Sequence, residues 1–358
     1  MTSIEVIPPP QPPVEFSDKS NRPAHESFYT VAGRFLCVTA PDEWSARLFE
    51  TYFSGWHVSP CTTPKGRKPD ATIAVRFNSG PPAPPVEFTS FDVALGGRCH
   101  TDGRTYYFEI QDSMVRVAAK SPPLVEVWIG GSPSARETSA LARIVFNAVM
   151  AALRRCGLFE LHGGGVVDPT SGVGALLIGP SGSGKSTLTM LLAASGWQYL
   201  SDDTLLLCGA EPGVEAWAWR RVFAVTEPTI AASRLSRLES VATSPVPFDP
   251  LKRRFEPQEL FPGGFVKACA PRALIFPAVT HEPATHVERL SQSSTMTRLL
   301  KMCPWSCYDR PVAREHLELL SRLARQSVAF DLFAGRDLMG DAERTSTLIA
   351  SLMKGETG

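Results

Sequence analysis

The stretch Gly174–Asp203 reads GALLIGPSGSGKSTLTMLLAASGWQYLSDD. It contains Gly179-Pro-Ser-Gly-Ser-Gly-Lys-Ser186, a full match to the pattern G-x-x-x-x-G-K-[ST]. The apolar run Ala175–Ile178 before this segment predicts a buried strand. After it, Leu188, Leu191 and Leu192 share one face of a predicted helix. The stretch therefore predicts a strand–loop–helix unit around residues 179–186, the glycine loop.

The residue types of the glycine loop suit phosphate binding. Its glycines allow a tight turn that points backbone N–H groups inward, towards the positive end of the helix that follows. Lys185 can reach the β- and γ-phosphates of ATP, and Ser186 can bind Mg²⁺. The alternative is a glycine-rich turn that binds nothing. The residues predicted to contact the nucleotide are Gly179, Pro180, Ser181, Gly182, Ser183, Gly184, Lys185, Ser186 and Thr187.

Two adjacent carboxylates follow the predicted helix, which ends near Gly196. Asp202 and Asp203 come after the apolar segment Gln198–Leu200. A returning strand would bring both acids back beside the glycine loop. One acid can then bind Mg²⁺, and the other can accept a proton from an attacking hydroxyl. The sequence leaves open which acid takes which role, and a solvated turn is the competing interpretation.

His162 lies upstream and precedes three glycines, residues 163–165. A lone histidine is more often structural than catalytic. The glycines after it, however, permit a close approach of the backbone to another group.

These segments together resemble the C-terminal domain of HPr kinase/phosphorylase and its superfamily of HPr-kinase-like proteins. The resemblance covers roughly Phe159–Leu352 and rests on Leu161-His-Gly163, the glycine loop and Ser201-Asp-Asp203. It implies ATP-dependent phosphorylation of a serine hydroxyl, with His162 and the acid pair in the active site. Thr187 stands where true HPr kinases usually carry glutamate, and Trp219–Phe223 replaces their glycine-rich Arg-Gly signature. These departures favour a divergent serine kinase, similar to lasso-peptide precursor kinases.

A basic cluster, Lys252-Arg-Arg254, follows the proline-bearing segment Ser244–Pro250, which is predicted to be a loop. A mobile basic residue can cover a transferred phosphate, and we assign this role to Arg253. A solvated face of the loop explains the cluster equally well.

The predicted organisation has three parts. Residues 1–27 are a proline-rich tail, residues 28–133 an α+β domain with a mainly antiparallel sheet, and residues 134–358 an α/β P-loop kinase domain of the HPr-kinase-like type. Ser139–Leu153 predicts an amphipathic helix that joins the two domains and packs on the sheet of the second.

Composition excludes several classes of protein. The 358 residues carry 36 basic and 36 acidic side chains, so no global field attracts nucleic acid or an acidic membrane surface. No apolar run approaches the ~18 residues of a membrane span, and the N-terminal residues lack the pattern of a secretion signal. The eight cysteines are scattered, and the pair Cys303 and Cys307 has no second pair at zinc-site spacing. These features predict a cytoplasmic protein.

The predicted function is that of an ATP- and Mg²⁺-dependent kinase, whose catalytic residues are His162, Lys185, Asp202, Asp203 and Arg253 and whose metal ligands are Ser186, Asp202 and Asp203. The expected acceptor is a serine of a peptide or small protein, HPr-like or a biosynthetic precursor. A nucleotide-binding regulator without phosphate transfer and a bifunctional kinase/phosphorylase are the alternatives. The sequence leaves open whether the chain forms a homo-oligomer.

Overall fold

The computed structural model describes residues 25–62, 66–76, 80–93, 97–118, 121–130, 138–246, 249–303 and 309–356. Of the predicted tail, residues 1–27, the first 24 residues lie outside this part, and residues 25–27 belong to a strand. The chain divides into two compact units, Met1–Cys156 with Cys307–Val312, and Gly157–Ser306 with Ala313–Gly358. Both are built from helices and sheets, so the chain has a mixed α/β fold.

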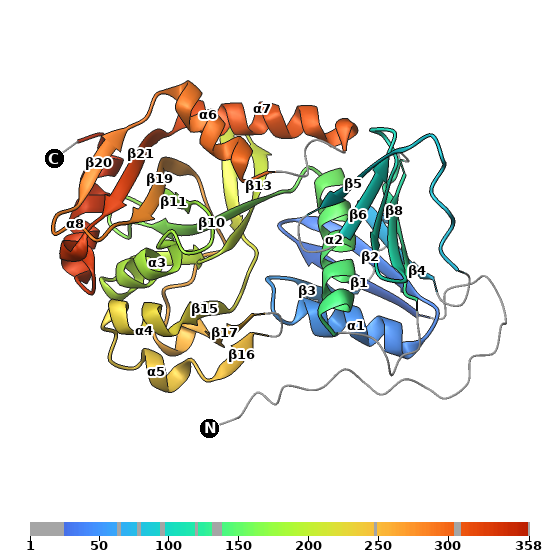
Figure 1. Cartoon of the computed structure of the whole chain (residues 1–358), viewed down its shortest axis with the longest axis horizontal. Helices are drawn as coiled ribbons and strands as arrows, with labels where there is room; N and C mark the ends of the chain where they lie inside the picture. Colours follow the sequence, from blue (N-terminus) through green and yellow to red (C-terminus); the bar gives the residue numbers. More distant parts are fainter. Residues whose placement is uncertain are drawn as a thin grey trace. The chain divides into compact units, whose positions relative to one another are not determined.

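The first unit contains one large sheet, with the strand order β3-β1-β2-β4-β9-β8-β7-β6-β5 (Figure 1). Neighbouring strands are antiparallel, apart from the parallel pairs β2–β4 and β4–β9. The strands are β1 (His25–Val31), β2 (Arg34–Ala40), β3 (Ser59–Cys61), β4 (Ala71–Arg76), β5 (Thr89–Val93), β6 (Gly97–Thr101), β7 (Tyr106–Ile110), β8 (Ser113–Val117) and β9 (Leu124–Trp128).

Two helices accompany this sheet. Helix α1 (Glu43–Phe53) begins at the N-cap Asp42, whose side chain accepts a hydrogen bond from the backbone N–H of Ser45 at 2.7 Å. Helix α2 (Thr138–Arg155) packs on β4, β8 and β9, whereas the sequence predicted contact with the sheet of the second domain. Its predicted stripe is buried as expected, including Ile144 and Val145. Amphipathic periodicity shows that one face of a helix is covered, but not which sheet covers it.

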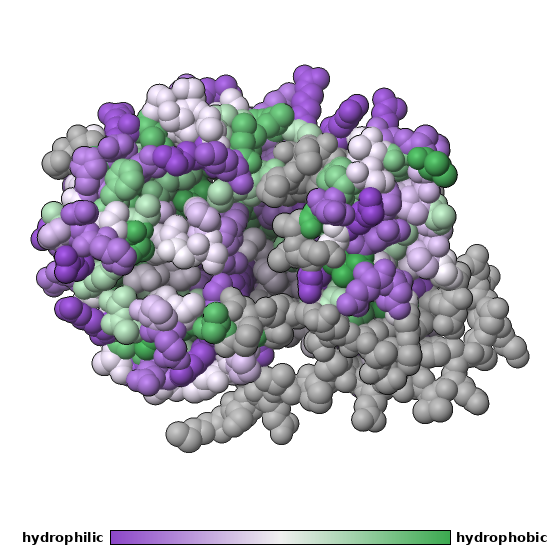
Figure 2. All heavy atoms as spheres, in the orientation of Figure 1, coloured by the Kyte–Doolittle hydropathy of each residue, from purple (hydrophilic) through white to green (hydrophobic). Residues whose placement is uncertain are grey.

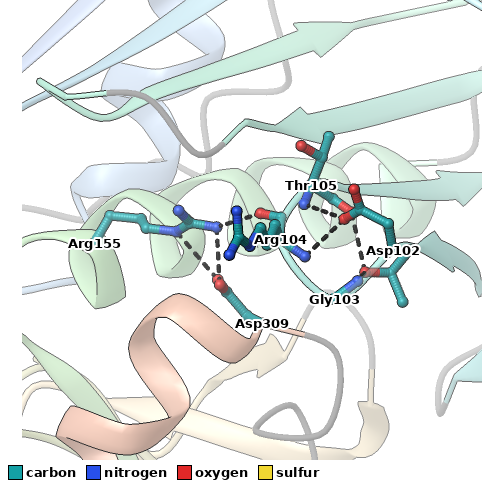
Figure 3. A network of polar contacts seen from close by, with 7 residues as sticks. Asp102, Gly103, Arg104, Thr105, Arg155 and Asp309 are labelled. Carbon is teal, nitrogen blue, oxygen red and sulfur yellow. Dashed lines mark hydrogen bonds and ion pairs between the residues drawn. The ribbon is translucent and has the colours of Figure 1, made fainter.

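A buried ion pair ties a late segment of the chain to this unit (Figure 3). Asp309 is fully buried, and its carboxylate accepts hydrogen bonds from Nε and Nη2 of Arg155 at 3.3 and 2.8 Å. The same Nη2 group donates to the backbone oxygen of Arg104 at 3.2 Å. Arg104 belongs to the turn between β6 and β7, where the carboxylate of Asp102 accepts the N–H groups of Arg104 and Thr105, both at 2.7 Å. Residues far apart in sequence thus share one network.

The second unit contains another large sheet, in the order β18-β14-β13-β10-β11-β19-β21-β20, with β12 also paired to β10. The pairs β11–β19 and β19–β21 are parallel, so the carboxyl ends of these three strands lie at one edge of the sheet. The strands are β10 (Phe159–Val167), β11 (Gly174–Ile178), β12 (Gln198–Ser201), β13 (Thr204–Ala210), β14 (Gly213–Ala218), β18 (Ala268–Cys269), β19 (Pro271–Val279), β20 (His286–Arg289) and β21 (Val328–Ala334).

Helices α3 (Lys185–Ala194) and α8 (Ala342–Met353) pack together against this sheet (Figure 1). The core between them includes Leu177, Leu192, Ile275, Phe330 and Ile349, which are all fully buried. Burial of this apolar surface holds α3, and with it the glycine loop, against the sheet. The remaining helices of the unit are α4 (Glu227–Ser233), α5 (Leu238–Val241), α6 (Gln292–Lys301) and α7 (Arg310–Gln326), with 3₁₀ turns at Pro257–Glu259 and Arg336–Leu338.

A small three-stranded sheet lies on the other side of α3, in the order β15 (Phe223–Thr226), β17 (Asp249–Phe255), β16 (Ser244–Val246). The prediction of a loop over Ser244–Pro250 is therefore wrong for the described residues of that segment. Aromatic contacts explain the strands, because Phe223 packs edge-on against both Tyr199 and Phe255. Tyr199 and Phe255 lie 24 and 32 positions away from Phe223 in sequence, beyond the reach of local pattern analysis.

Hydrophilic residues cover most of the described surface in Figure 2, and hydrophobic residues form small, separate patches. Among the described residues, no helix has both the length and the apolar composition needed to cross a bilayer. Most of the described cysteines are buried, among them Cys99, Cys269 and Cys303, while Cys307 lies outside the described residues.

Candidate functional site

The glycine loop joins the end of β11 to the start of α3, in the predicted strand–loop–helix order. Gly182 and Gly184 have φ values of 82° and 102°, in the left-handed region that favours glycine. Lys185 is 5% exposed and folds back over the loop, where Nζ donates to the backbone oxygens of Gly179 and Pro180 at 2.7 and 2.8 Å. Burial lowers the pKa of Lys185 below its ordinary value, although Asp203 and Asp202 act in the opposite direction. The loop thus holds its lysine at the end of a parallel strand.

Strand β10 lies between the strand that precedes the glycine loop and the strands that flank the acid pair. It pairs with β11 on one side and with β12 and β13 on the other. A Cβ atom on Gly164 would lie 2.7 Å from Oγ1 of Thr189 and 3.2 Å from the backbone oxygen of Ser201. The glycine therefore allows α3 to pack close to β10, as the three consecutive glycines predicted.

Asp202 and Asp203 form the junction between β12 and β13, and the backbone oxygen of Asp203 accepts the N–H of Gly163 at 2.7 Å. Oδ2 of Asp203 accepts a hydrogen bond from Oγ1 of Thr204 at 2.9 Å and lies 3.2 Å from Nη1 of Arg220. Burial alone would raise the pKa of Asp203, but Arg220 and His162 outweigh it and hold this pKa below its ordinary value. Asp203 is therefore ionised at neutral pH.

The imidazole of His162 lies between the lysine and this carboxylate. Nε2 lies 3.2 Å from Nζ of Lys185, and Nδ1 lies 3.7 Å from Oδ1 of Asp203. Burial lowers the pKa of His162, with a further lowering by Lys185, while Asp203 opposes the shift. A neutral ring with its proton on Nδ1 satisfies both neighbours, because Nε2 then accepts from the ammonium group and Nδ1–H points to the carboxylate.

Asp202 has a different environment from Asp203. It is 1% exposed, and its Oδ2 accepts the N–H of Ala224 at 3.4 Å. Oδ1 is buried without a hydrogen-bond partner among the described residues. Burial raises the pKa of Asp202 to about 6, while Arg220 and the nearby hydroxyl of Ser186 act in the opposite direction.

The unpartnered Oδ1 of Asp202 bears on whether the site suits Mg²⁺. An unsatisfied buried carboxylate oxygen is costly, and a cation would remove that cost. Ser186 and Asp202 offer hydroxyl and carboxylate oxygens, which Mg²⁺ prefers. Among the described residues, no three His, Cys, Asp or Glu side chains gather into a metal cluster. This donor set fits a cation that keeps several waters and binds substrate phosphates, rather than one enclosed by protein ligands.

A cavity of about 370 Å³ opens beside the glycine loop, at the carboxyl edge of the parallel strands. This volume lies in the range of small-molecule sites. Charged groups from Lys185, Asp203, Arg220 and Lys252 reach it. The other lining residues are Ser181, Gly182, Gly184, Ser186, Thr187, Leu188, Leu191, Ala224, Thr226, Pro228, Thr229, Ala232, Val279, Ala334, Gly335, Leu338 and Met339, many of them apolar.

The residues of the basic cluster lie on β17 and have different surroundings. Lys252 lines the cavity and contributes to lowering the pKa values of His162 and Lys185. Arg253 instead forms an ion pair with Glu227 and is absent from the described lining. Successive side chains of a strand point to opposite sides, so neighbours in the cluster have different surroundings. The structure brings His162, Lys185 and Asp203 together with Lys252 rather than with Arg253.

Arg220 is a site residue that was not predicted from the sequence, where Trp219–Phe223 was noted only as the segment that replaces a glycine-rich signature. The hairpin β13–β14 pairs Leu205 with Ala218 and Ala210 with Gly213. Continuing this register beyond Ala218 brings residue 220 opposite residue 203. The tight turn at Glu211-Pro212 could have predicted this pairing of residues 203 and 220, because a turn sets the register of its hairpin.

Comparisons with known proteins add little. No family model matches the chain, and no curated protein matches it. Among solved structures, the chain is similar to the HPr(Ser) kinase/phosphatase from Coxiella burnetii. The identity is 14%, the match covers 37% of this chain and 72% of that chain, and the TM-score is 0.24. The function is therefore inferred from the residues of the site.

Proposed function

We propose that this protein is an ATP- and Mg²⁺-dependent kinase with an HPr-kinase-like P-loop domain, which transfers the γ-phosphate to a serine hydroxyl of a peptide or small protein. One observation carries the proposal. The lysine of the glycine loop, an imidazole and an ionised carboxylate form a continuous chain, Lys185–His162–Asp203, with separations of 3.2 and 3.7 Å. A phosphate site and a proton acceptor are thus adjacent, as transfer to a hydroxyl requires.

ATP is the proposed substrate in the cavity. The backbone N–H groups of the glycine loop and the positive end of α3 attract its phosphates. Nζ of Lys185, which donates to Gly179 and Pro180 in this structure, would exchange those carbonyl partners for phosphate oxygens. Lys252 and Arg220 line the same cavity and would offset negative charge on the transferred group. The apolar residues of the lining, such as Leu191 and Pro228, suit the flat faces of a base.

The two acids take separate roles in this proposal. Asp203 lines the cavity, and its Oδ1 would accept the proton of the serine Oγ. The Oγ–P bond then forms as the bond between the γ-phosphorus and the bridging oxygen breaks, which releases ADP. His162 orients Asp203 through Nδ1. Because the pKa of Asp203 is low, it is a weak base, and most of the rate enhancement is expected to come from positioning and charge.

Ser186 and Asp202 would hold Mg²⁺. The support is the buried, unpartnered Oδ1 of Asp202 and the Ser186 hydroxyl near the same carboxylate. When bound, the cation would neutralise charge on the phosphate oxygens.

The test is phosphate transfer from ATP labelled at the γ-position, with Mg²⁺, to the phosphocarrier HPr and to a set of serine-containing peptides. Expected are labelled phosphoserine in at least one acceptor and its loss in Lys185→Ala. Calorimetry without an acceptor runs in parallel. Absence of Mg²⁺-dependent ATP binding in the wild-type protein would refute the proposal. Binding without transfer to any acceptor would favour the regulator that the sequence left as an alternative.

A further inference from the structure

A second cavity, of about 450 Å³, lies at the opposite edge of the second sheet from the glycine loop. Strands β11, β19 and β21 run parallel, and their carboxyl ends face the first cavity, which Val279 and Ala334 line. Arg272 and Val328, near the amino ends of β19 and β21, line the second. Seven residues of strand separate Arg272 from Val279, roughly 23 Å at ~3.3 Å per residue. The second cavity is therefore distinct from the proposed ATP site.

Three arginines from three elements meet at this cavity. They are Arg272 in β19, Arg289 at the end of β20 and Arg325 in the last turn of α7. The described lining contains no aspartate or glutamate. Within the described part of the chain, Arg272 and Arg289 have no carboxylate partner, and Nη1 of Arg325 donates to Oγ of Ser321 at 3.0 Å. The three arginines are exposed, so water screens part of their mutual repulsion, and an anion bound between them would offset the rest.

Two further features support anion binding at this cavity. The first turn of α6 contributes Gln292 and Thr295 to the lining, so the positive end of a ten-residue helix faces the same space. The end of α7 is also held in place. Nε2 of Gln326 donates to the backbone oxygens of Val214 and Pro271, both at 3.0 Å, and its Oε1 accepts the N–H of Val214 at 2.8 Å. The neighbouring Arg325 is thereby presented from a rigid element.

We infer that this arginine pocket binds a small organic anion with at least two phosphate or carboxylate groups. The volume of about 450 Å³ lies in the range of small-molecule sites. Guanidinium groups pair with both phosphate and carboxylate through two parallel hydrogen bonds, so the pocket chemistry recognises either group. Three separate arginines match a ligand with more than one charged group.

The test is a calorimetric titration with pyrophosphate and, separately, with citrate, without added divalent cation. Binding of at least one probe at submillimolar to millimolar concentration is expected. Arg272→Ala, Arg289→Ala and Arg325→Ala should each weaken that binding about tenfold or more. Arg314→Ala is the matched control, because Arg314 is an exposed arginine of α7 that pairs with Glu318 and does not line the pocket. It should leave affinity unchanged.

The Lys185→Ala variant separates this pocket from the glycine loop. Binding that survives in Lys185→Ala and is lost in the arginine variants supports the inference, whether or not the protein proves to be a kinase. Binding of pyrophosphate alone identifies phosphate as the recognised group, and binding of citrate alone identifies carboxylate. Absence of binding by both probes overturns the inference, as does binding that all three arginine variants retain.

Discussion

Asp202 and Asp203 are consecutive residues whose carboxylates have opposite electrostatic environments. Burial raises the pKa of Asp202 to about 6, whereas Arg220 and His162 outweigh burial at Asp203 and lower its pKa. Asp203 lines the cavity beside the glycine loop, and Asp202 is buried behind it next to Ser186. The two acids are therefore suited to different tasks.

Replacement of each acid by asparagine should separate these tasks. Asp203→Asn should keep Mg²⁺–ATP binding and reduce phosphate transfer about 10²-fold, the lower end of the range for a general base, because Asp203 is a weak base. Asp202→Asn should weaken the Mg²⁺ dependence of nucleotide binding as well as transfer. The measurements are transfer rate and nucleotide affinity at several Mg²⁺ concentrations. Wild-type behaviour of both variants would show that the acid pair has a structural rather than a catalytic role.

Lys252→Ala should lower kcat more than it changes the affinity for ATP. Lys252 lines the cavity, and in the proposed reaction it contacts the transferred group mainly in the transition state, which affects the rate. Arg253→Ala should have the smaller effect, because Arg253 pairs with Glu227. Lys267→Ala, an exposed lysine outside the described lining, is the control. A larger loss in Arg253→Ala than in Lys252→Ala would contradict this assignment and support the sequence prediction.

The raised pKa of Asp202 predicts a pH-dependent stability difference. In the folded protein the carboxyl of Asp202 stays protonated up to about pH 6, whereas in the unfolded chain it ionises near its ordinary pKa of 3.8. The free energy of unfolding therefore falls as the pH rises through this window. Asp202→Asn removes this loss. Without divalent cations, the variant should match the wild type near pH 4 and exceed it by at most about 3 kcal/mol above pH 7.

Thermal unfolding of both proteins across this range provides the measurement. Asp203→Asn serves as a control, because its effect on stability at neutral pH is expected to be opposite to that of Asp202→Asn. The pKa of Asp203 is lowered, so its stabilising effect is present above 3.8 and is lost as pH falls through the lower folded-state value. Asp203→Asn should therefore be less stable than the wild type at neutral pH. A constant difference between Asp202→Asn and the wild type at every pH would contradict the inferred burial of the charge.

Asp309→Ala should destabilise the first unit by about 3–5 kcal/mol, because it leaves the buried Arg155 without its partner (Figure 3). Glu318→Ala removes an exposed partner of Arg314 within α7 and should cost about 0.5 kcal/mol or less. Denaturant unfolding monitored for each unit separately distinguishes the two results. Equal, small effects of both substitutions would show that the Asp309–Arg155 pair contributes little.

Local sequence determined the elements around the glycine loop. The apolar run Ala175–Ile178, the glycines and the leucine stripe each act over a few residues, and the strand, turn and helix form where they predict. The N-caps of α1 and α6, Asp42 and Ser291, likewise act within one helical turn, where each side chain accepts a backbone N–H three residues later. His162 and the acid pair lie near Lys185. Strand β11 follows the strand of His162 and leads to Lys185, and helix α3 leads from Lys185 back to the strand before the acid pair.

Tertiary structure decided what depends on partners distant in sequence. The choice of sheet for α2, the pairing of Arg155 with Asp309 and the strand at Asp249–Phe255 all arise from contacts between segments far apart in the chain. The same holds for the site, where the register of β13–β14 brings Arg220 to Asp203, and β17 directs Lys252 rather than Arg253 to the cavity. A run of three basic residues does not by itself show which side chain faces the site. The direction of each side chain is set only when the strand pairs and packs.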